Sequence, residues 1–173
     1  MEYLKEELEC LEFVNADNIA YGLSPFRPEN VAVSAGKIML LRISDLINQN
    51  VDFAIETTLS SKTLLSKIKF AKENNYEINL IFYWLESPDI AVERVKSRVE
   101  SGGHGIQEEV IIRRYSRGIK NFFEIFMNEC AYWLMINNSG LEPSIIAEGT
   151  EEEIFITDNI TWKNLKVEYG QKI

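Results

Sequence analysis

Residues 76–86 read YEINLIFYWLE, a near-continuous apolar run of strand-forming residues. Such a run is typical of a strand that is buried on both faces, as in a parallel sheet covered by helices. Ser87 and Pro88 follow it and predict the start of a helix that runs to the turn SGGHG at 101–105. A buried strand that leads directly into a helix is the repeating unit of an α/β fold.

The same alternation extends from this stretch in both directions. Strands are predicted at 12–17, 51–59 and 131–140, with a short antiparallel hairpin over 144–158 and a polar tail after it. Helices are predicted at 2–10, 29–48, from Ser60 or Ser61 to about 74, and at about 107–129, with a loop over 21–30. The pattern predicts the α/β class: a parallel sheet flanked by helices, in one domain over residues 1–173.

The composition excludes several classes of protein. The net charge of −9 over 173 residues argues against nucleic-acid and anionic-membrane binding, because both require a positive field. No apolar run approaches the roughly 20 residues of a membrane span, and the acidic start is unlike a signal peptide. Cys10 and Cys130 are too few for a disulfide framework or a metal cluster. We therefore expect a cytoplasmic protein with two reduced thiols.

A basic segment interrupts this acidic chain between Arg94 and Lys120, where seven basic and three acidic residues give a local charge of +4. Arg94 and Arg98 lie four residues apart, as do Arg113 and Arg117, so each pair shares a helix face. Arginine suits phosphate because its rigid fork offers paired donors and stays charged. The segment is interpreted as a site for a small phosphorylated ligand, with a solvated helix face carrying internal ion pairs as the alternative.

Gly102, Gly103 and Gly105 separate the two arginine-bearing helices and predict a turn that flexes. A hinged basic arm of this kind can close over a polyphosphate and exclude water. His104 lies in the same turn, where a phosphate contact and an ordinary surface histidine both stay open.

Polar residues follow the ends of two predicted strands, Asp17 after FVNA and Glu56, Thr57 and Thr58 after DFAI. In parallel α/β sheets, ligands bind beyond the carboxyl ends of the strands. A carboxylate held there can accept the proton of a substrate hydroxyl, and neighbouring Glu and Thr side chains can bind hydroxyls or phosphate. The alternatives are a helix cap or Asx turn for Asp17 and a cap of the next helix for the threonines.

The segment VSAGKIM at 33–39 contains a Gly-Lys pair but is not a phosphate-binding P-loop. That loop needs a further glycine upstream and Ser or Thr directly after the lysine, whereas Val31 and Ile38 occupy these positions. The segment also lies inside the predicted helix 29–48. No other segment of the 173 residues matches the loop.

Four segments in order resemble the zeta-toxin-like family of P-loop kinases, over roughly residues 12–150. They are FVNADNIAYGLSPF (13–26), FAIETTLS (53–60), IFYWLESPDIAVERVKSRVESGGHGIQEEVIIRRYSRGIKNFF (81–123) and WLMINNSG (133–140). The GGH turn with its flanking arginines is the most specific part. The resemblance implies a nucleoside-kinase type of α/β fold with a helical lid. It also implies phosphate transfer from ATP, with Mg²⁺, to a sugar nucleotide such as UDP-N-acetylglucosamine or a similar hydroxyl acceptor.

By this resemblance, Asp17 corresponds to the base that accepts the proton of the substrate hydroxyl. Glu56 and Thr58 correspond to the strand end that contacts the substrate, and Asn15 and Thr57 are assigned to the same substrate site.

The resemblance also assigns the basic segment to the ATP phosphates, because Arg98 and one of Arg113 or Arg114 correspond to arginines of the lid. The full set predicted for the phosphates and lid is Arg94, Arg98, His104, Arg113, Arg114 and Arg117. No residue is predicted as a metal ligand.

The chain departs from the family pattern at its start. Family members place a strand, a GxxxxGK[ST] loop and a helix before the strand that leads to Asp17, whereas this chain begins in that helix. We expect the first strand and the Walker A loop to be lacking, either because Met1 is an internal or misassigned start or because the gene is a truncated remnant. Single electrostatic donors are worth about 10²–10³ in rate, so the expectation is little or no kinase activity and poor ATP–Mg²⁺ binding.

Three functions stay open at this point. The first is an ATP-dependent kinase whose sequence is incomplete, and the second is a non-catalytic remnant that binds a nucleotide or sugar nucleotide. The third is a protein-interaction module that an antitoxin or a complementing N-terminal fragment completes.

Overall fold

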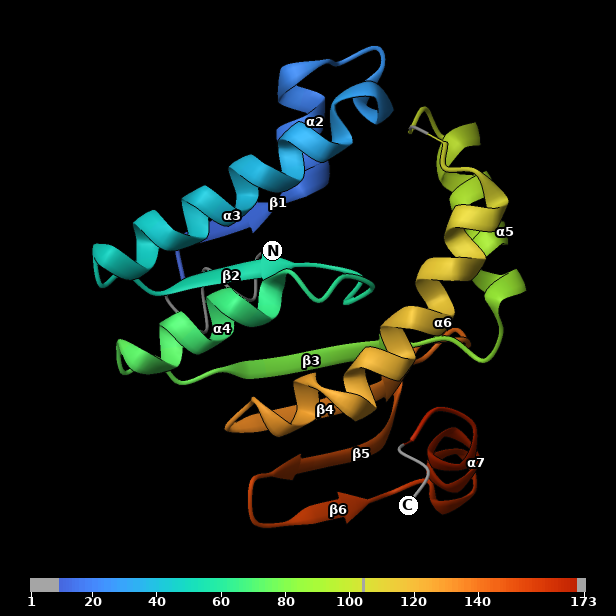
Figure 1. Ribbon diagram of the computed structural model, residues 1–173. Coiled ribbons are helices and arrows are strands. Elements are labelled where there is room, and N and C mark those ends of the chain that lie inside the picture. Colours follow the sequence, from blue (N-terminus) through green and yellow to red (C-terminus); the bar gives the residue numbers. More distant parts are fainter. Residues whose placement is uncertain (1–9, 104, 171–173) are drawn as a thin grey trace. The chain divides into compact units, whose positions relative to one another are not determined.

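A computed structural model of the chain describes residues 10–103 and 105–170 (Figure 1). The chain divides into two compact units, Met1–Thr57 and Thr58–Ile173. Each unit contains strands and helices, so the predicted α/β class is confirmed. One kinase-like domain over residues 1–173 stays a prediction. His104 and nearly all of the predicted helix 2–10 lie outside the described residues.

The first unit is built around one amphipathic helix. Its elements in chain order are β1 (Glu12–Asn15), α2 (Ala16–Leu23), a 3-10 helix (Pro28–Val31), α3 (Ala32–Asn48) and β2 (Phe53–Glu56). β1 and β2 pair in parallel with Asn15 opposite Glu56, so the two carboxyl ends meet at one edge. The buried residues of α3 recur at helical spacing and are Ala35, Met39, Ile43, Leu46 and Ile47. This apolar stripe forms the core of the unit.

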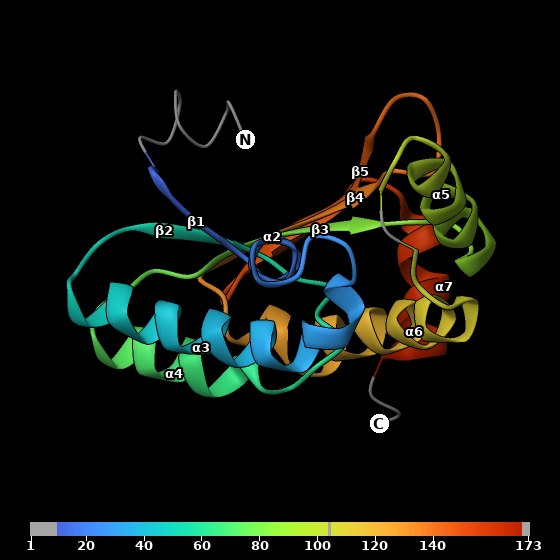
Figure 2. The same ribbon diagram turned by 90° about the horizontal axis from the view of Figure 1, so that it is seen from above.

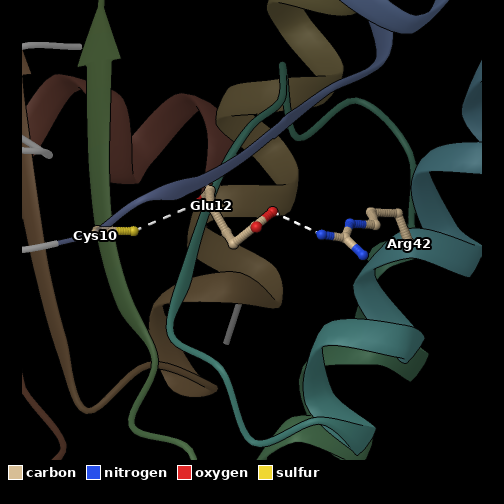
Figure 3. A network of polar contacts seen from close by, with 3 residues as sticks. All are labelled: Cys10, Glu12 and Arg42. Carbon is tan, nitrogen blue, oxygen red and sulfur yellow. Dashed lines mark hydrogen bonds and ion pairs between the residues drawn. The ribbon is translucent and has the colours of Figure 1, made fainter.

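A polar contact links α3 to β1 in the first unit (Figure 3). Arg42 Nη2 donates to Glu12 Oε2 at 2.8 Å, and the Cys10 thiol donates to the backbone carbonyl of Glu12 at 3.5 Å. The two charged side chains are 41% and 39% exposed, so the ion pair contributes at most about 1 kcal/mol. Apolar burial along α3, rather than this pair, therefore holds the unit together.

The second unit contains a four-stranded sheet. Its elements are α4 (Leu64–Glu73), β3 (Asn79–Trp84), α5 (Pro88–Glu100), α6 (Glu108–Glu124), a 3-10 helix (Phe126–Asn128), β4 (Tyr132–Asn137), β5 (Ser144–Thr150), β6 (Ile154–Ile156) and α7 (Asn159–Tyr169). The strand order is β3–β4–β5–β6, with β3 and β4 parallel and the other pairs antiparallel. The hairpin predicted over 144–158 is confirmed as β5 and β6.

Aromatic side chains pack α6 and α7 onto the same face of this sheet (Figure 2). Phe122 of α6 stacks on Phe82 with ring centroids 4.9 Å apart and meets Trp133 edge-on at 5.5 Å. Trp162 of α7 stacks on Trp133 at 5.5 Å with the ring planes 5° apart. The prediction of a polar tail after the hairpin is therefore wrong. Residues 159–169 form a helix because Trp162 and Leu165 bury one narrow stripe against the core.

Phe82 of β3 packs against α6, but the side chains on the other face of this strand are exposed to solvent. The prediction that β3 is buried on both faces is therefore wrong. Ile81 is 51% exposed and Tyr83 is 58% exposed, whereas their neighbour Trp84 is buried. Alternate residues of a strand point to opposite faces, and only one face of β3 lies against helices of the second unit. An apolar run alone does not distinguish the two situations.

The described strands pair in two sheets, β1–β2 in the first unit and β3–β4–β5–β6 in the second, and the single parallel sheet stays a prediction. Two other sequence predictions are corrected. The chain after β1 is helical from Ala16 rather than extended to Asp17. α4 begins at Leu64, because the Ser61 hydroxyl accepts the Thr63 N–H at 3.2 Å in a turn and does not cap the helix.

The predicted start of α5 is confirmed. Ser87 is its N-cap, with its hydroxyl accepting the Ile90 N–H at 3.4 Å, and Pro88 is its first residue. Within the described residues, no helix is both long enough and apolar enough to cross a membrane.

Candidate functional site

Two of the predicted substrate residues, Asn15 and Glu56, meet at the carboxyl ends of β1 and β2. Asn15 Nδ2 donates to Glu56 Oε2 at 2.6 Å. Asn15 Oδ1 accepts the backbone N–H groups of Asp17 at 2.7 Å and of Asn18 at 3.0 Å. Asn15 is thus the N-cap of α2 and binds Glu56 at the same time. The parallel pairing of β1 with β2 brings Asn15 and Glu56 together, and their assignment to a substrate site stays a prediction.

Asp17 lies in the first turn of α2 and is exposed. The helix cap that the sequence left open for Asp17 is made by Asn15 instead. Among residues 10–103 and 105–170, no side chain or backbone group binds the Asp17 carboxylate. The carboxylate is therefore available to a hydroxyl of a substrate.

The two predicted threonines follow β2 directly. Thr57 is the last residue of the first unit and Thr58 the first residue of the second. The hydroxyls of Thr58 and Ser60 are hydrogen-bonded at 2.9 Å. Neither threonine caps α4, because that helix begins only at Leu64.

A cleft of about 600 Å³ in the second unit lies between the loop before α4 and one face of α6. Its lining residues are Ser60, Ser61, Lys62, Arg113, Arg114, Arg117, Lys120, Asn121 and Glu124. Five of these residues are basic and one is acidic. The structure thus brings together three of the predicted phosphate-binding arginines and Lys120 of the same basic segment, and adds Lys62, Ser60 and Ser61, which the sequence did not assign to this site. This combination suits a phosphate group, since arginine forks and hydroxyls both donate to phosphate oxygens.

The arginines of the cleft are not neutralised by neighbouring acids. Lys120 pairs with Glu124 at 3.6 Å. In the part of the chain that the structure describes, no hydrogen bond or ion pair reaches the side chains of Arg113, Arg114 or Arg117. The described residues thus show no internal ion pair at these three arginines, while a solvated helix face fits the exposure of Arg113 and Arg117.

α6 is held in place by residues that the sequence did not single out. The Tyr115 hydroxyl donates to the Leu85 carbonyl at 2.8 Å, and burial raises the pKa of Tyr115 so that the proton stays on the hydroxyl. A Cβ atom at Gly118 would lie 2.6 Å from the Thr58 carbonyl oxygen. The buried Asn121 side chain donates from Nδ2 to the Leu59 carbonyl at 2.7 Å. An isolated glycine inside a helical pattern was the one sequence signal that could have marked this contact.

The glycine turn after α5 has a local structural role. Gly102 has a φ of +91°, the Gly103 N–H donates to the Arg98 carbonyl, and the Gly102 N–H donates to the Val99 carbonyl, both at 2.9 Å. These two bonds form a Schellman cap that ends the helix. Helix termination therefore explains Gly102 and Gly103 without a hinge, whereas Gly105 takes no part in this cap.

Arg94 and Arg98 are not among the residues that line the cleft. Arg94 donates from Nη2 to the Asn138 carbonyl, a contact that joins α5 to the end of β4. Arg98 lies in the last turn of α5, and His104 falls outside the described residues. Within the residues that the structure describes, no group of three or more His, Cys, Asp or Glu side chains is arranged to hold a metal ion.

Comparison with known proteins gives one relative and one structural neighbour. The chain is 32% identical over 102 residues to an uncharacterized protein of Haemophilus influenzae (strain ATCC 51907 / DSM 11121 / KW20 / Rd), which covers 59% of this chain and 73% of the relative. The fold of this chain resembles that of a chain described in the molecular and structural characterization of the PezAT chromosomal toxin–antitoxin system of the human pathogen Streptococcus pneumoniae. The TM-score is 0.62, with 12% identity, over 98% of this chain and 71% of that chain. At this identity the likeness shows a shared fold. No protein-family model matches the chain.

Proposed function

We propose that this chain, which belongs to one family with the Haemophilus influenzae protein, is a phosphotransferase of the zeta-toxin-like kinase type, with a sugar nucleotide or similar alcohol as acceptor. The fold shared with a chain of a toxin–antitoxin system supports the structural part of the proposal. The observation that carries the chemical part is the basic cleft along α6, with three arginines that no described residue neutralises.

The cleft fits the polyphosphate of ATP. Arg113 and Arg117 lie one helical turn apart, so their guanidinium groups can bind successive phosphates, while Ser60 and Ser61 donate from the opposite wall. Fixed positive charge stabilises the negative charge that develops on the transferring phosphoryl group. Mg²⁺, which would add charge neutralisation when bound, is expected to arrive with the nucleotide, because the described residues offer no acidic cluster for it.

The acceptor is proposed to bind at the carboxyl ends of β1 and β2, at the group formed by Asn15, Asp17 and Glu56, which is called the strand-end group below. In the proposed reaction Asp17 accepts the proton of the acceptor hydroxyl, the hydroxyl oxygen forms a bond to the γ-phosphorus of ATP, and the bond from that phosphorus to the leaving ADP breaks. Glu56 accepts hydrogen bonds from other hydroxyls of the acceptor, and Asn15 holds the Glu56 carboxylate in place at 2.6 Å. We also propose that the protein is cytoplasmic, because its proposed substrates are ATP and a sugar nucleotide or similar alcohol.

Turnover by the 173 residues is expected to be weak. They contain no GxxxxGK[ST] loop, whose backbone amides and lysine normally bind the phosphates. Binding should therefore be easier to detect than transfer, and turnover near the ~1–100 s⁻¹ of small kinases would contradict this expectation.

Calorimetric titration with ATP–Mg²⁺ and with UDP-N-acetylglucosamine tests the proposal. We expect saturable binding that the substitution Arg117→Gln weakens about tenfold, since a hydrogen bond to a charged group contributes about 1.5–3 kcal/mol. Arg27→Gln is the matched control, because Arg27 is exposed and is not among the residues that line the cleft. Equal affinity for all three proteins would refute the assignment of the cleft.

A second function, binding of a protein partner, is favoured by the open face of β3. Its edge is not paired by any described strand, and Ile81 and Tyr83 expose apolar surface beside it. Such an edge can accept a further strand from a partner, such as an antitoxin or a complementing fragment. Light scattering distinguishes the two functions: concentration-dependent oligomers without small-molecule binding would favour the partner.

A further inference from the structure

The loop that forms one wall of the basic cleft is fixed to the helix that forms the other wall. Asn121 is only 5% exposed, and its amide donates to the Leu59 carbonyl at 2.7 Å. One turn earlier on the same helix, Gly118 lets the Thr58 carbonyl approach so closely that a Cβ would lie 2.6 Å from it. Two consecutive carbonyls of the loop are thus held by two residues of α6.

The backbone of the loop is also turned at this point. Leu59 has a φ of +53°, which is unusual for a residue with a side chain, and its side chain is buried. Ser60, Ser61 and Lys62 follow it directly and line the cleft. A shift of the Leu59 carbonyl would therefore move the whole wall.

The two contact points alternate with the basic residues of α6. Arg117 precedes Gly118, and Lys120 precedes Asn121. The contacts at Gly118 and Asn121 therefore determine how far the serine hydroxyls of the loop lie from Arg117 and Lys120. This distance is the width of the cleft that is available to a phosphate chain.

We infer that Gly118 and Asn121 are positioning residues for anion binding: they lock the Thr58–Lys62 loop onto α6 and so set the affinity of the cleft for a polyphosphate. This inference rests on the proposed function, because it takes the cleft as the phosphate site. It assigns to both residues a role that acts through the carbonyls of the Thr58–Lys62 loop, and Asn121 also lines the cleft.

The test uses the full chain and inorganic pyrophosphate as the probe, with affinity measured by calorimetry. Gly118→Ala should weaken binding about tenfold, since displacement of binding groups by about 1 Å can change interaction strength by this order or more. Gly36→Ala is the matched control, because Gly36 also lies inside a helix and a Cβ there would meet no atom within 4 Å. It should bind pyrophosphate within twofold of the wild type.

Asn121→Ser gives a second, independent variant, since a serine hydroxyl is too short to reach the Leu59 carbonyl. It should also weaken binding, and in both variants the amide signals of Ser60, Ser61 and Lys62 should shift in ¹⁵N–¹H spectra of the folded, ligand-free chain. These readouts separate positioning from stability, because affinity is measured at a temperature where circular dichroism shows each variant folded.

The affinities for pyrophosphate distinguish failure of this inference from failure of the proposed function. If wild-type affinity survives in either variant that folds, the inference is wrong while the proposed function stands. A wild-type chain that does not bind pyrophosphate refutes both. Weakened binding in Gly118→Ala and Asn121→Ser, with the Gly36→Ala control unchanged, supports the inference.

Discussion

Replacing Asn15 by alanine should reveal how the strand-end group of the first unit is built. Asn15 has two separate tasks: its Oδ1 caps α2 by accepting two backbone N–H groups, and its Nδ2 binds Glu56 at 2.6 Å. Asn15→Ala removes both. Asn15→Ser keeps a good capping oxygen but cannot reach Glu56, so the pair of variants separates the two contributions.

The magnitude follows from the two bonds. Loss of an N-cap costs about 1 kcal/mol. A hydrogen bond to a carboxylate contributes about 1.5–3 kcal/mol, and solvent exposure at this site places it near or below the lower end, at about 1 kcal/mol. Asn15→Ala should therefore reduce the free energy of unfolding of the first unit by about 2 kcal/mol, and Asn15→Ser by about half as much.

The assay must report on the first unit. Trp84, Trp133 and Trp162 all lie in the second unit, so tryptophan fluorescence would miss the change. Urea unfolding followed by far-ultraviolet circular dichroism, with hydrogen exchange of residues 16–23, follows α2 directly.

A double-mutant cycle isolates the contact itself. Asn15→Ala, Glu56→Ala and the double variant should give a coupling energy of about 1 kcal/mol. A coupling energy of zero would show that the 2.6 Å bond contributes nothing, and unchanged exchange in residues 16–23 of Asn15→Ala would refute the capping role.

Three further predictions concern the second unit. Trp162→Ala should destabilise it by about 3–5 kcal/mol, because the indole is 4% exposed, whereas Trp162→Phe should cost less; urea unfolding read by circular dichroism measures both. The pKa of Asp158 is lowered by hydrogen bonds from the Thr161 side chain and from backbone N–H groups. The ionised Asp158 carboxylate therefore stabilises the folded chain fully at pH values above its unfolded-state pKa of about 3.9. This stabilisation is lost as the pH falls through the lower pKa of the folded state. Asp158→Asn keeps a capping oxygen, so its unfolding midpoint should vary less with pH in this range. Burial raises the pKa of Cys130 to about 11, so iodoacetamide at pH 8 should label Cys10 in the folded chain and Cys130 only after denaturation, as read by mass spectrometry.

The sequence by itself determined features that depend on neighbouring residues. Ser87 and Pro88 predicted the start of α5, because a cap and a first-turn proline act within one helical turn. The sequence also placed Asp17 and Glu56 just beyond the carboxyl ends of two predicted strands, and the parallel pairing of β1 with β2 brings those ends to one edge. The four-residue spacing of Arg113 and Arg117 likewise predicted their common face along the cleft.

Only the tertiary structure decided features that depend on distant partners. The helix at Trp162 exists because its indole stacks on Trp133, 29 residues earlier in the chain. Gly118 and Asn121 acquire their roles from carbonyls of a loop about 60 residues away. The burial of β3 was mispredicted for the same reason. Its apolar residues predict burial, but the sequence does not show which other elements pack against each face of the strand. A local signal such as Ser87–Pro88 marks where one helix begins, whereas long-range contacts decide what each element touches.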